Sequence, residues 1–284
     1  MPSKKLIDFL TTANEFRVHT GNISAWGELK LRTFNNCSDE LIECLKLQLR
    51  KWEPSEEELA NAERSRDSGG ADFALLQCPF CVPCHAIGRY PRDDLRVTVK
   101  AFLARADAGD VRECVRHVNR ELEIDYTDQL IVALPDPEAD ALVAPCPAGQ
   151  LEGMWPMLEQ LVDDGHLAAL GVADLTEQDL REVWRLETRI KPLVNHYNVG
   201  ACGPVPPDLA EFAKQHDLLL LAHDDPHPFF TNDHVLEILT ECLGLPSELA
   251  EKWRATWAAR YSVIVKSRSV IGWRGYVVHF EQKQ

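Results

Sequence analysis

The sequence has 284 residues, of which 45% are hydrophobic and 26% charged, a composition typical of a soluble globular protein with a sizeable core. Its 45 acidic side chains outnumber 30 basic ones, giving a formal net charge of -15. Such a surface repels phosphate and anionic lipid, so neither nucleic acid nor a membrane is expected as a partner. Since the N-terminus does not resemble a secretory signal and no apolar run approaches roughly 20 residues, we expect a cytoplasmic protein.

Short apolar runs recur along the chain with helical segments between them. We predict strands at residues 17–19, 73–77, 97–103, 130–134, 168–172, 193–198, 218–222 and 263–265. The later six are rich in Leu, Ile and Val and show little polar alternation, which is typical of parallel strands covered on both faces. Eight such strands alternating with helices favour a closed (β/α)8 barrel, although an open doubly wound sheet gives a similar pattern.

Two helices are predicted from the residues that start them. One opens at Thr176, where Asp179 completes a capping box ahead of an apolar stripe. Another begins after Pro206 and Pro207, whose fixed φ suits the first turn of a helix. Because no linker or internal repeat interrupts the pattern, we expect one domain spanning residues 1–284.

Nine cysteines are scattered along the chain, and in a reducing compartment most should be free thiols. Cys78, Cys81, Cys84 and His85 stand close together, with spacing that could chelate Zn²⁺ or form a reversible disulfide. The chain has no second CxxC pair to complete a zinc site. We therefore expect no metal, and interpret residues 53–90 as a divergent, insertion-like surface segment.

Four stretches resemble aldo-keto reductases. Residues 91–103 (PRDDLRVTVKAFL) are similar to the third-strand region of that family, and residues 121–137 (ELEIDYTDQLIVALPDP) to its fourth strand and the preceding helix. Residues 161–183 follow the fifth βα unit, and residues 190–198 the sixth. The resemblance makes the barrel the better interpretation of the strand pattern.

Three further stretches together resemble the regulatory subunits of glutamate–cysteine ligase: residues 20–26 (TGNISAW), 202–226 and 260–276. The similarity covers residues 20–52 and 91–276. It implies a (β/α)8 TIM barrel of the aldo-keto reductase type with a modified C-terminal end and no chemistry of its own. It also implies a heterodimer with the ligase catalytic subunit, in which apparent glutamate affinity rises and feedback inhibition by glutathione weakens.

The reductase resemblance assigns catalytic positions that can be tested residue by residue. In those enzymes a Tyr donates a proton, and a Lys, an Asp and a His adjust its acidity. Lys100 stands at the Lys position, but Ala133 replaces the His, and no tyrosine occurs between Ala25 and Gln77 to serve as the acid. The sequence therefore offers no residue for the acid catalyst, and Lys100 is expected to be vestigial or part of an ion pair.

The cofactor positions implied by the resemblance are altered as well. The Ser-Asn pair that holds the nicotinamide reads Ala173-Asp174, the Gln reads His196, and the stacking aromatic reads His223. Three residues keep the basic sequence that grips the adenosine phosphate in reductases: Lys266, Ser267 and Arg268. The alternative is that these side chains lie at the end of a strand, in contact with water. No cofactor is expected, and the rival function is an NADPH-dependent aldo-keto reductase.

Five residues are candidates for contact with a partner or for redox chemistry: Cys202, His223, Asp224, Asp225 and Trp273. Cys202 stands where the regulatory subunits carry a cysteine pair, although a loop thiol without a partner is the alternative. The histidine and two aspartates could be imagined as metal ligands with His227, but a solvated loop with local turn bonds is our interpretation. Trp273 offers interface surface, with core packing as the alternative.

Overall fold

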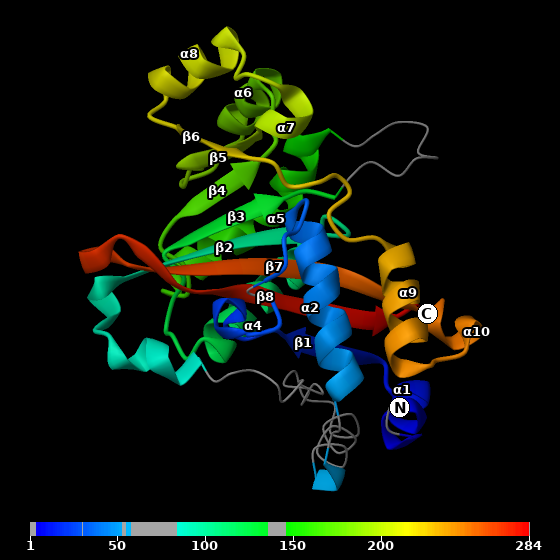
Figure 1. Cartoon of the computed structure of the whole chain (residues 1–284). Coiled ribbons are helices and arrows are strands. Elements are labelled where there is room, and N and C mark those ends of the chain that lie inside the picture. The colour runs from blue at the N-terminus through cyan, green and yellow to red at the C-terminus, as the bar shows by residue number, and fades with distance from the viewer. Residues whose placement is uncertain (1–3, 30, 53–54, 58–83, 136–145, 284) are drawn as a thin grey trace. The chain divides into compact units, whose positions relative to one another are not determined.

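The computed structural model describes residues 4–29, 31–52, 55–57, 84–135 and 146–283. The predicted strand at residues 73–77, together with Cys78 and Cys81, lies outside this part of the chain. The described strands form one eight-stranded sheet in the order β1-β8-β7-β2-β3-β4-β5-β6 (Figure 1). Strands β1 and β6 thus stand at the two ends of that order.

The chain divides into two compact units. Unit 1 comprises residues 1–84, 230–258 and 274–284, and unit 2 comprises residues 85–229 and 259–273. Two long strands, β7 (Trp253–Val265) and β8 (Val270–Gln282), contribute residues to both units. The expectation of one domain stays a prediction.

Unit 1 contains one further strand and several helices: α1 (Lys4–Thr12), β1 (Glu15–His19), η1 (Ile23–Ala25), α2 (Cys37–Lys51), α9 (Asn232–Leu243) and α10 (Ser247–Ala250). Strand β1 pairs antiparallel with β8, so that Phe16 lies opposite Phe280. These two rings stack with centroids 4.5 Å apart, and Trp253 meets Phe16 edge-on at 5.0 Å. Three aromatic side chains therefore form the centre of this core.

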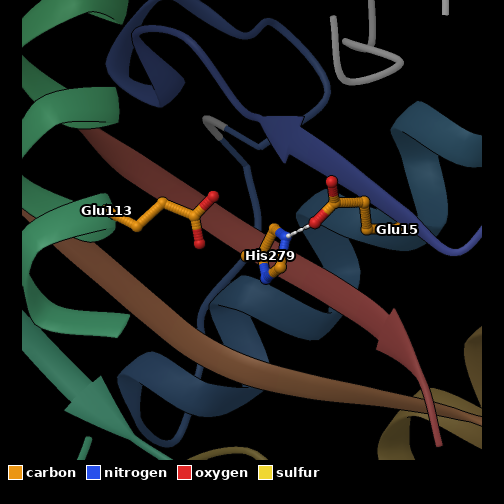
Figure 2. A group of neighbouring side chains, drawn as sticks. All are labelled: Glu15, Glu113 and His279. Atoms are coloured by element: carbon orange, nitrogen blue, oxygen red, sulfur yellow. Dashed lines mark hydrogen bonds and ion pairs between the residues drawn. The ribbon is translucent and has the colours of Figure 1, made fainter. Parts of the chain in front are cut away.

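A buried histidine links the strands of unit 1. Figure 2 shows His279 on β8, with its Nε2 3.1 Å from Glu15 Oε2 on β1. Its Nδ1 lies 2.7 Å from the Thr256 hydroxyl oxygen on β7, and its ring stacks on Trp257 with centroids 5.6 Å apart. Both ring nitrogens thus have partners, as a buried imidazole requires.

Unit 2 holds the alternating strands and helices that the apolar runs predict. Its elements are η2 (Cys84–Arg89), η3 (Arg92–Asp94), β2 (Leu95–Leu103), α4 (Ala108–Glu121), β3 (Gln129–Ala133), α5 (Pro147–Asp163), β4 (Leu170–Ala173), α6 (Glu177–Arg185), β5 (Val194–Asn198), α7 (Val199–Cys202), α8 (Pro207–Gln215), β6 (Leu219–His223) and η4 (Lys266–Arg268). Strands β2 to β6 follow chain order, and each consecutive pair among them is parallel (Figure 1). The prediction of parallel strands is confirmed for five of the six runs, and the sixth, residues 263–265, lies in β7.

Two helices of unit 2 begin at the capping and proline residues that the sequence predicts. Helix α6 opens with the predicted capping box, in which Thr176 accepts from the Asp179 N–H and the Asp179 carboxylate accepts from the Thr176 N–H. Helix α8 begins at Pro207, as predicted, and buries its apolar side chains. Since caps satisfy main-chain donors that have no partner within a helix, these residues determine where the helices begin.

The C-terminal end departs from a regular barrel, as the resemblance implies. Strands β7 and β8 are neighbours in the sheet and are joined by four residues, a connection short enough only for antiparallel strands. The sequence predicted only residues 263–265 of β7 and none of β8. Both strands mix polar and apolar residues instead of forming a continuous apolar run, so the search for buried parallel strands missed them.

The fold class is confirmed as α/β, with one eight-stranded sheet among the described residues. The strand order is not the consecutive order of a regular barrel, because β8 returns to pair with β1. Among the described residues, no helix is long and apolar enough to cross a membrane.

Candidate functional site

Charged side chains gather in unit 2, toward the carboxyl ends of its parallel strands. They lie on β2, at the end of β6, on β7, and in the loops after β4 and β6. We refer to Lys100, Asp174, His223, Asp225 and Arg260 as the Lys100 cluster. Folds with parallel strands commonly carry their functional groups at this end of the sheet.

Lys100 lies at the centre of the cluster and is only 3% exposed. Its Nζ donates to Asp225 Oδ2 at 2.7 Å and lies 3.4 Å from His223 Nε2. Burial lowers the pKa of Lys100, and the neighbouring Asp225 carboxylate only partly offsets that effect. The ammonium is therefore held by a buried ion pair.

Asp225 joins the two cations of the cluster. Besides Lys100, it binds both terminal nitrogens of the Arg260 guanidinium, with the second nitrogen 3.0 Å from Oδ2. The Asn198 side-chain amide donates to the Asp225 main-chain carbonyl at 2.8 Å and thereby fixes the loop after β6. Bidentate pairing with Arg is the strong form of such an interaction, and the Asp225 carboxylate, at 2% exposure, is shielded from water.

His223 lies between two carboxylates. Its Nε2 is 2.9 Å from Asp174 Oδ1, and its Nδ1 is 3.2 Å from Asp225 Oδ2 and accepts from the Asp225 N–H at 3.1 Å. Burial disfavours the charged ring, but hydrogen bonds to Asp174 and then Asp225 outweigh it and raise the pKa of His223. His223 therefore stays protonated to a higher pH than a free histidine in water does.

Asp174 adopts a left-handed backbone conformation, with φ of 60°. Among residues with a side chain, aspartate is one of the few that tolerates this region. Its Oδ2 lies 3.1 Å from His227 Nε2, while Oδ1 faces His223. Burial would raise the pKa of Asp174, yet the hydrogen bonds from His223 and His227 lower it well below the usual range. A strained turn therefore presents a permanently ionised carboxylate to two imidazoles.

His196 on β5 borders the cluster without joining its ion pairs. Its ring centroid is 5.7 Å from that of His223. Burial, with the positive charge of Lys100, lowers the pKa of His196 to about 4. The two neighbouring histidines are therefore shifted in opposite directions, and His196 is neutral at neutral pH.

The charges in the cluster balance without a bound ligand. Lys100 and Arg260 oppose Asp174 and Asp225, and His223 provides a site for one further proton. Within the described part of the chain, Lys100 has no hydrogen bond to a tyrosine, and Ala133 is a buried methyl group at the end of β3. This arrangement can hold charges and a proton in place, with Lys100 bound by Asp225.

The structure corrects the interpretation of residues 223–227 as a solvated loop. His223 and Asp225 are buried and turn toward Lys100, although Asp224 between them is exposed. The prediction failed because neighbouring side chains need not point apart when the chain leaves the extended conformation after β6. Charge pairing with Lys100 and Arg260, which are distant in sequence, decided the outcome.

The remaining candidates lie apart from the Lys100 cluster. Cys202 ends α7 and is exposed, while Trp273 is 8% exposed and meets Tyr90 edge-on at 5.6 Å. The basic triplet forms η4 at the tip of the β7–β8 hairpin, where Lys266 donates to the Asp93 carbonyl. All three of its residues are exposed: Lys266, Ser267 and Arg268.

Two members of the cysteine-rich stretch reach the described part of the chain. Cys84 and His85 lie in η2, where the structure describes only their backbone. Cys78 and Cys81 lie outside the described residues. The expectation that this stretch holds no metal stays a prediction.

Two residues around the site, Arg260 and Asn198, were not assigned a role from sequence, and His227 was considered only as a metal ligand. Arg260, Asn198 and His227 each bind a carboxylate or a main-chain group of the cluster. No sequence signal set Arg260 apart, because β7 also contains Arg254 and Thr256. Its partner could not be known before the strands were paired.

Comparison with known proteins places the chain in a family. Residues 79–224 match the aldo/keto reductase family. The glutamate–cysteine ligase regulatory subunit of Rattus norvegicus is 30% identical over 275 residues, covering 96% of this chain and 95% of that protein. The chain belongs to the family of glutamate–cysteine ligase regulatory subunits. The Homo sapiens regulatory subunit is 29% identical over 275 residues, with the same coverage of both chains.

Among solved structures, the aldose reductase of Giardia lamblia is similar, with 22% identity and a TM-score of 0.41. The match covers 50% of this chain and 52% of that one.

Proposed function

We propose that the chain is a non-catalytic regulatory subunit of glutamate–cysteine ligase that works in the cytoplasm by binding the catalytic subunit as a heterodimer. The observation that carries the proposal is the 30% identity to the Rattus norvegicus regulatory subunit, which extends over 96% of this chain. Similarity along almost the whole chain supports a shared role better than similarity confined to the barrel strands, which many unrelated functions share.

The regulatory effect requires the subunit to bind one conformation of its partner more tightly than another. Tighter binding to the active conformation raises the apparent affinity for glutamate and weakens feedback inhibition by glutathione. Because this coupling is reciprocal, bound glutamate strengthens the subunit interaction by the same factor. The first surfaces to test are residues 202–207 and 223–229, which include the exposed Cys202 and Asp224.

The Lys100 cluster supports the absence of reductase chemistry. Lys100 is bound by Asp225 instead of acting on a tyrosine, and the buried Ala133 cannot orient a carbonyl. Asp174 and His223 stand where the resemblance implies nicotinamide contacts, and they bind each other. We propose that no nicotinamide cofactor binds, and that Lys100, Asp174 and His223 now stabilise unit 2.

The deciding experiment purifies this chain with and without the ligase catalytic subunit and measures complex formation and the glutamate dependence of ligation. We expect a one-to-one complex, a lower KM for glutamate and weaker inhibition by glutathione. Failure to form a complex would contradict the proposal.

A separate measurement on the isolated chain tests its rival, the NADPH-dependent aldo-keto reductase. Titration with NADPH should leave the nucleotide fluorescence unquenched, and aldehyde should not be consumed. Stoichiometric quenching together with steady turnover would replace the regulatory proposal with an enzymatic one.

A further inference from the structure

Strand β6 is an apolar strand with an open edge. It stands last in the sheet order and, within the described part of the chain, pairs with β5 alone (Figure 1). Its sequence, LLLAH over Leu219–His223, contains no Lys, Pro or Gly. Natural edge strands usually carry such residues, because an unprotected edge invites pairing with another strand.

The register identifies which main-chain groups are open. The Leu219 N–H donates to the Leu193 carbonyl on β5 at 2.9 Å. In a pleated strand, the N–H and C=O of one residue point to the same side and those of the next residue to the other side. The N–H and C=O groups of Leu220 and Ala222 therefore point away from β5, toward the open edge.

The side chains along this edge are exposed as well. Leu219 is 57% exposed and Leu221 is 41% exposed, while Leu193 on the neighbouring segment is 52% exposed. A continuous apolar run in a parallel sheet is normally covered on both faces. Apolar side chains gathered on an open edge mark a surface that another chain covers.

The charges around β6 decide what kind of chain fits. Asp217 and Asp224 are both exposed and flank the strand at its two ends. A second copy would bring the same acidic residues and a further net charge of -15 to the contact, so self-pairing is opposed by repulsion. A strand with apolar side chains at its centre and Lys or Arg on either side satisfies both the open edge and the aspartates.

We propose that β6 is the docking edge for the ligase catalytic subunit, which adds an extended apolar strand flanked by basic residues. This inference rests on the proposed function and names the contact that the heterodimer uses. The added strand accepts from the N–H groups of Leu220 and Ala222, and its own apolar side chains pack beside Leu219 and Leu221 on one face of the sheet. It extends the sheet of unit 2 by one strand.

The test uses the full chain, the catalytic subunit and a pair of matched variants. Ala222→Pro removes an edge-facing N–H without removing a bond to β5, while Ala222→Val retains that N–H. We expect Ala222→Pro to weaken the complex by at least about tenfold, through one lost hydrogen bond and the clash of its ring with the added strand. Ala222→Val should bind within about threefold of the wild type.

Hydrogen exchange gives a second readout that needs no variant. Amide exchange across residues 218–224 should slow on addition of the catalytic subunit, because Leu220 and Ala222 gain acceptors. If the wild-type complex forms without slower exchange at these amides, the edge is not the contact, while the regulatory function stands. If no complex forms with the wild type, both proposals fail.

Sedimentation of the chain alone tests self-pairing. A dimer that Ala222→Pro abolishes would assign the edge to a second copy and overturn the proposal. Thermal unfolding of both variants checks their folding, and equal loss of binding by Ala222→Pro and Ala222→Val would also contradict it.

Discussion

The Lys100 cluster and the β6 edge belong to the same unit and meet at His223, yet they reverse the usual distribution of side chains. Lys100 and Asp225 are charged and 3% and 2% exposed, whereas Leu219 is apolar and 57% exposed. The difference separates buried charges, which hold the strand ends of unit 2 together, from an exposed apolar edge, which we propose for docking. Four predictions follow, in order of expected effect.

The largest effect is expected from Asp225→Ala. Removing this carboxylate leaves Lys100 and Arg260 without their shared partner, and breaking a buried ion pair from one side costs about 3–5 kcal/mol of unfolding free energy. Chemical denaturation measures the loss. The matched control is Asp224→Ala at the exposed neighbouring residue, which should change stability by less than about 0.5 kcal/mol. Equal effects of the two variants would show that the cluster is not structural.

The next effect concerns acid stability. Because the pKa of His196 is lowered from 6.5 to about 4, the unfolded chain binds its proton before the folded chain does. Stability is therefore lost as pH falls through this interval. His196→Gln removes the titrating group, and its unfolding free energy should fall less between pH 6.5 and 4. Parallel pH profiles for the two proteins would contradict the assigned burial of His196.

His223 should act in the opposite sense within the same profile. Because the pKa of His223 is raised in the folded chain, its protonation stabilises the fold at pH values below the ordinary pKa of about 6.5. That stabilisation is lost as the pH rises through the pKa of the folded state. The His196→Gln variant retains His223, so its profile isolates this loss on the alkaline side.

The smallest effect is expected at the edge. Leu219→Thr should change the unfolding free energy by less than about 0.5 kcal/mol, because the side chain is already exposed. Its neighbour Leu218 is 5% exposed, and Leu218→Ala should cost about 2–5 kcal/mol. Urea unfolding of the two variants distinguishes them. A large loss from Leu219→Thr would mean that this side chain is covered within the chain itself.

Much of unit 2 followed from local sequence. The apolar runs predicted β2 to β6 to within a few residues, and Thr176 with Asp179 placed the start of α6. The strands β7 and β8 were predicted only in small part. Their alternation of polar and apolar residues reflects pairing with β1 and with each other, which is a property of distant segments.

The site was predictable by position but not by contact. Lys100, Asp174 and His223 were each identified as occupying reductase positions, yet nothing in the sequence joined them to one another or to Arg260. Their hydrogen bonds span from 35 to 125 residues of chain.

The sequence by itself determined the acidic charge, the α/β class, the parallel strands and the family resemblance, because composition, periodicity and motifs are local properties. Only the tertiary structure decided that β8 returns to β1, that Asp225 neutralises Lys100 and Arg260, and that β6 is left at an edge. The physical reason is that pairing and burial depend on which distant segments meet, and that choice minimises the free energy of the whole chain and not of any one stretch.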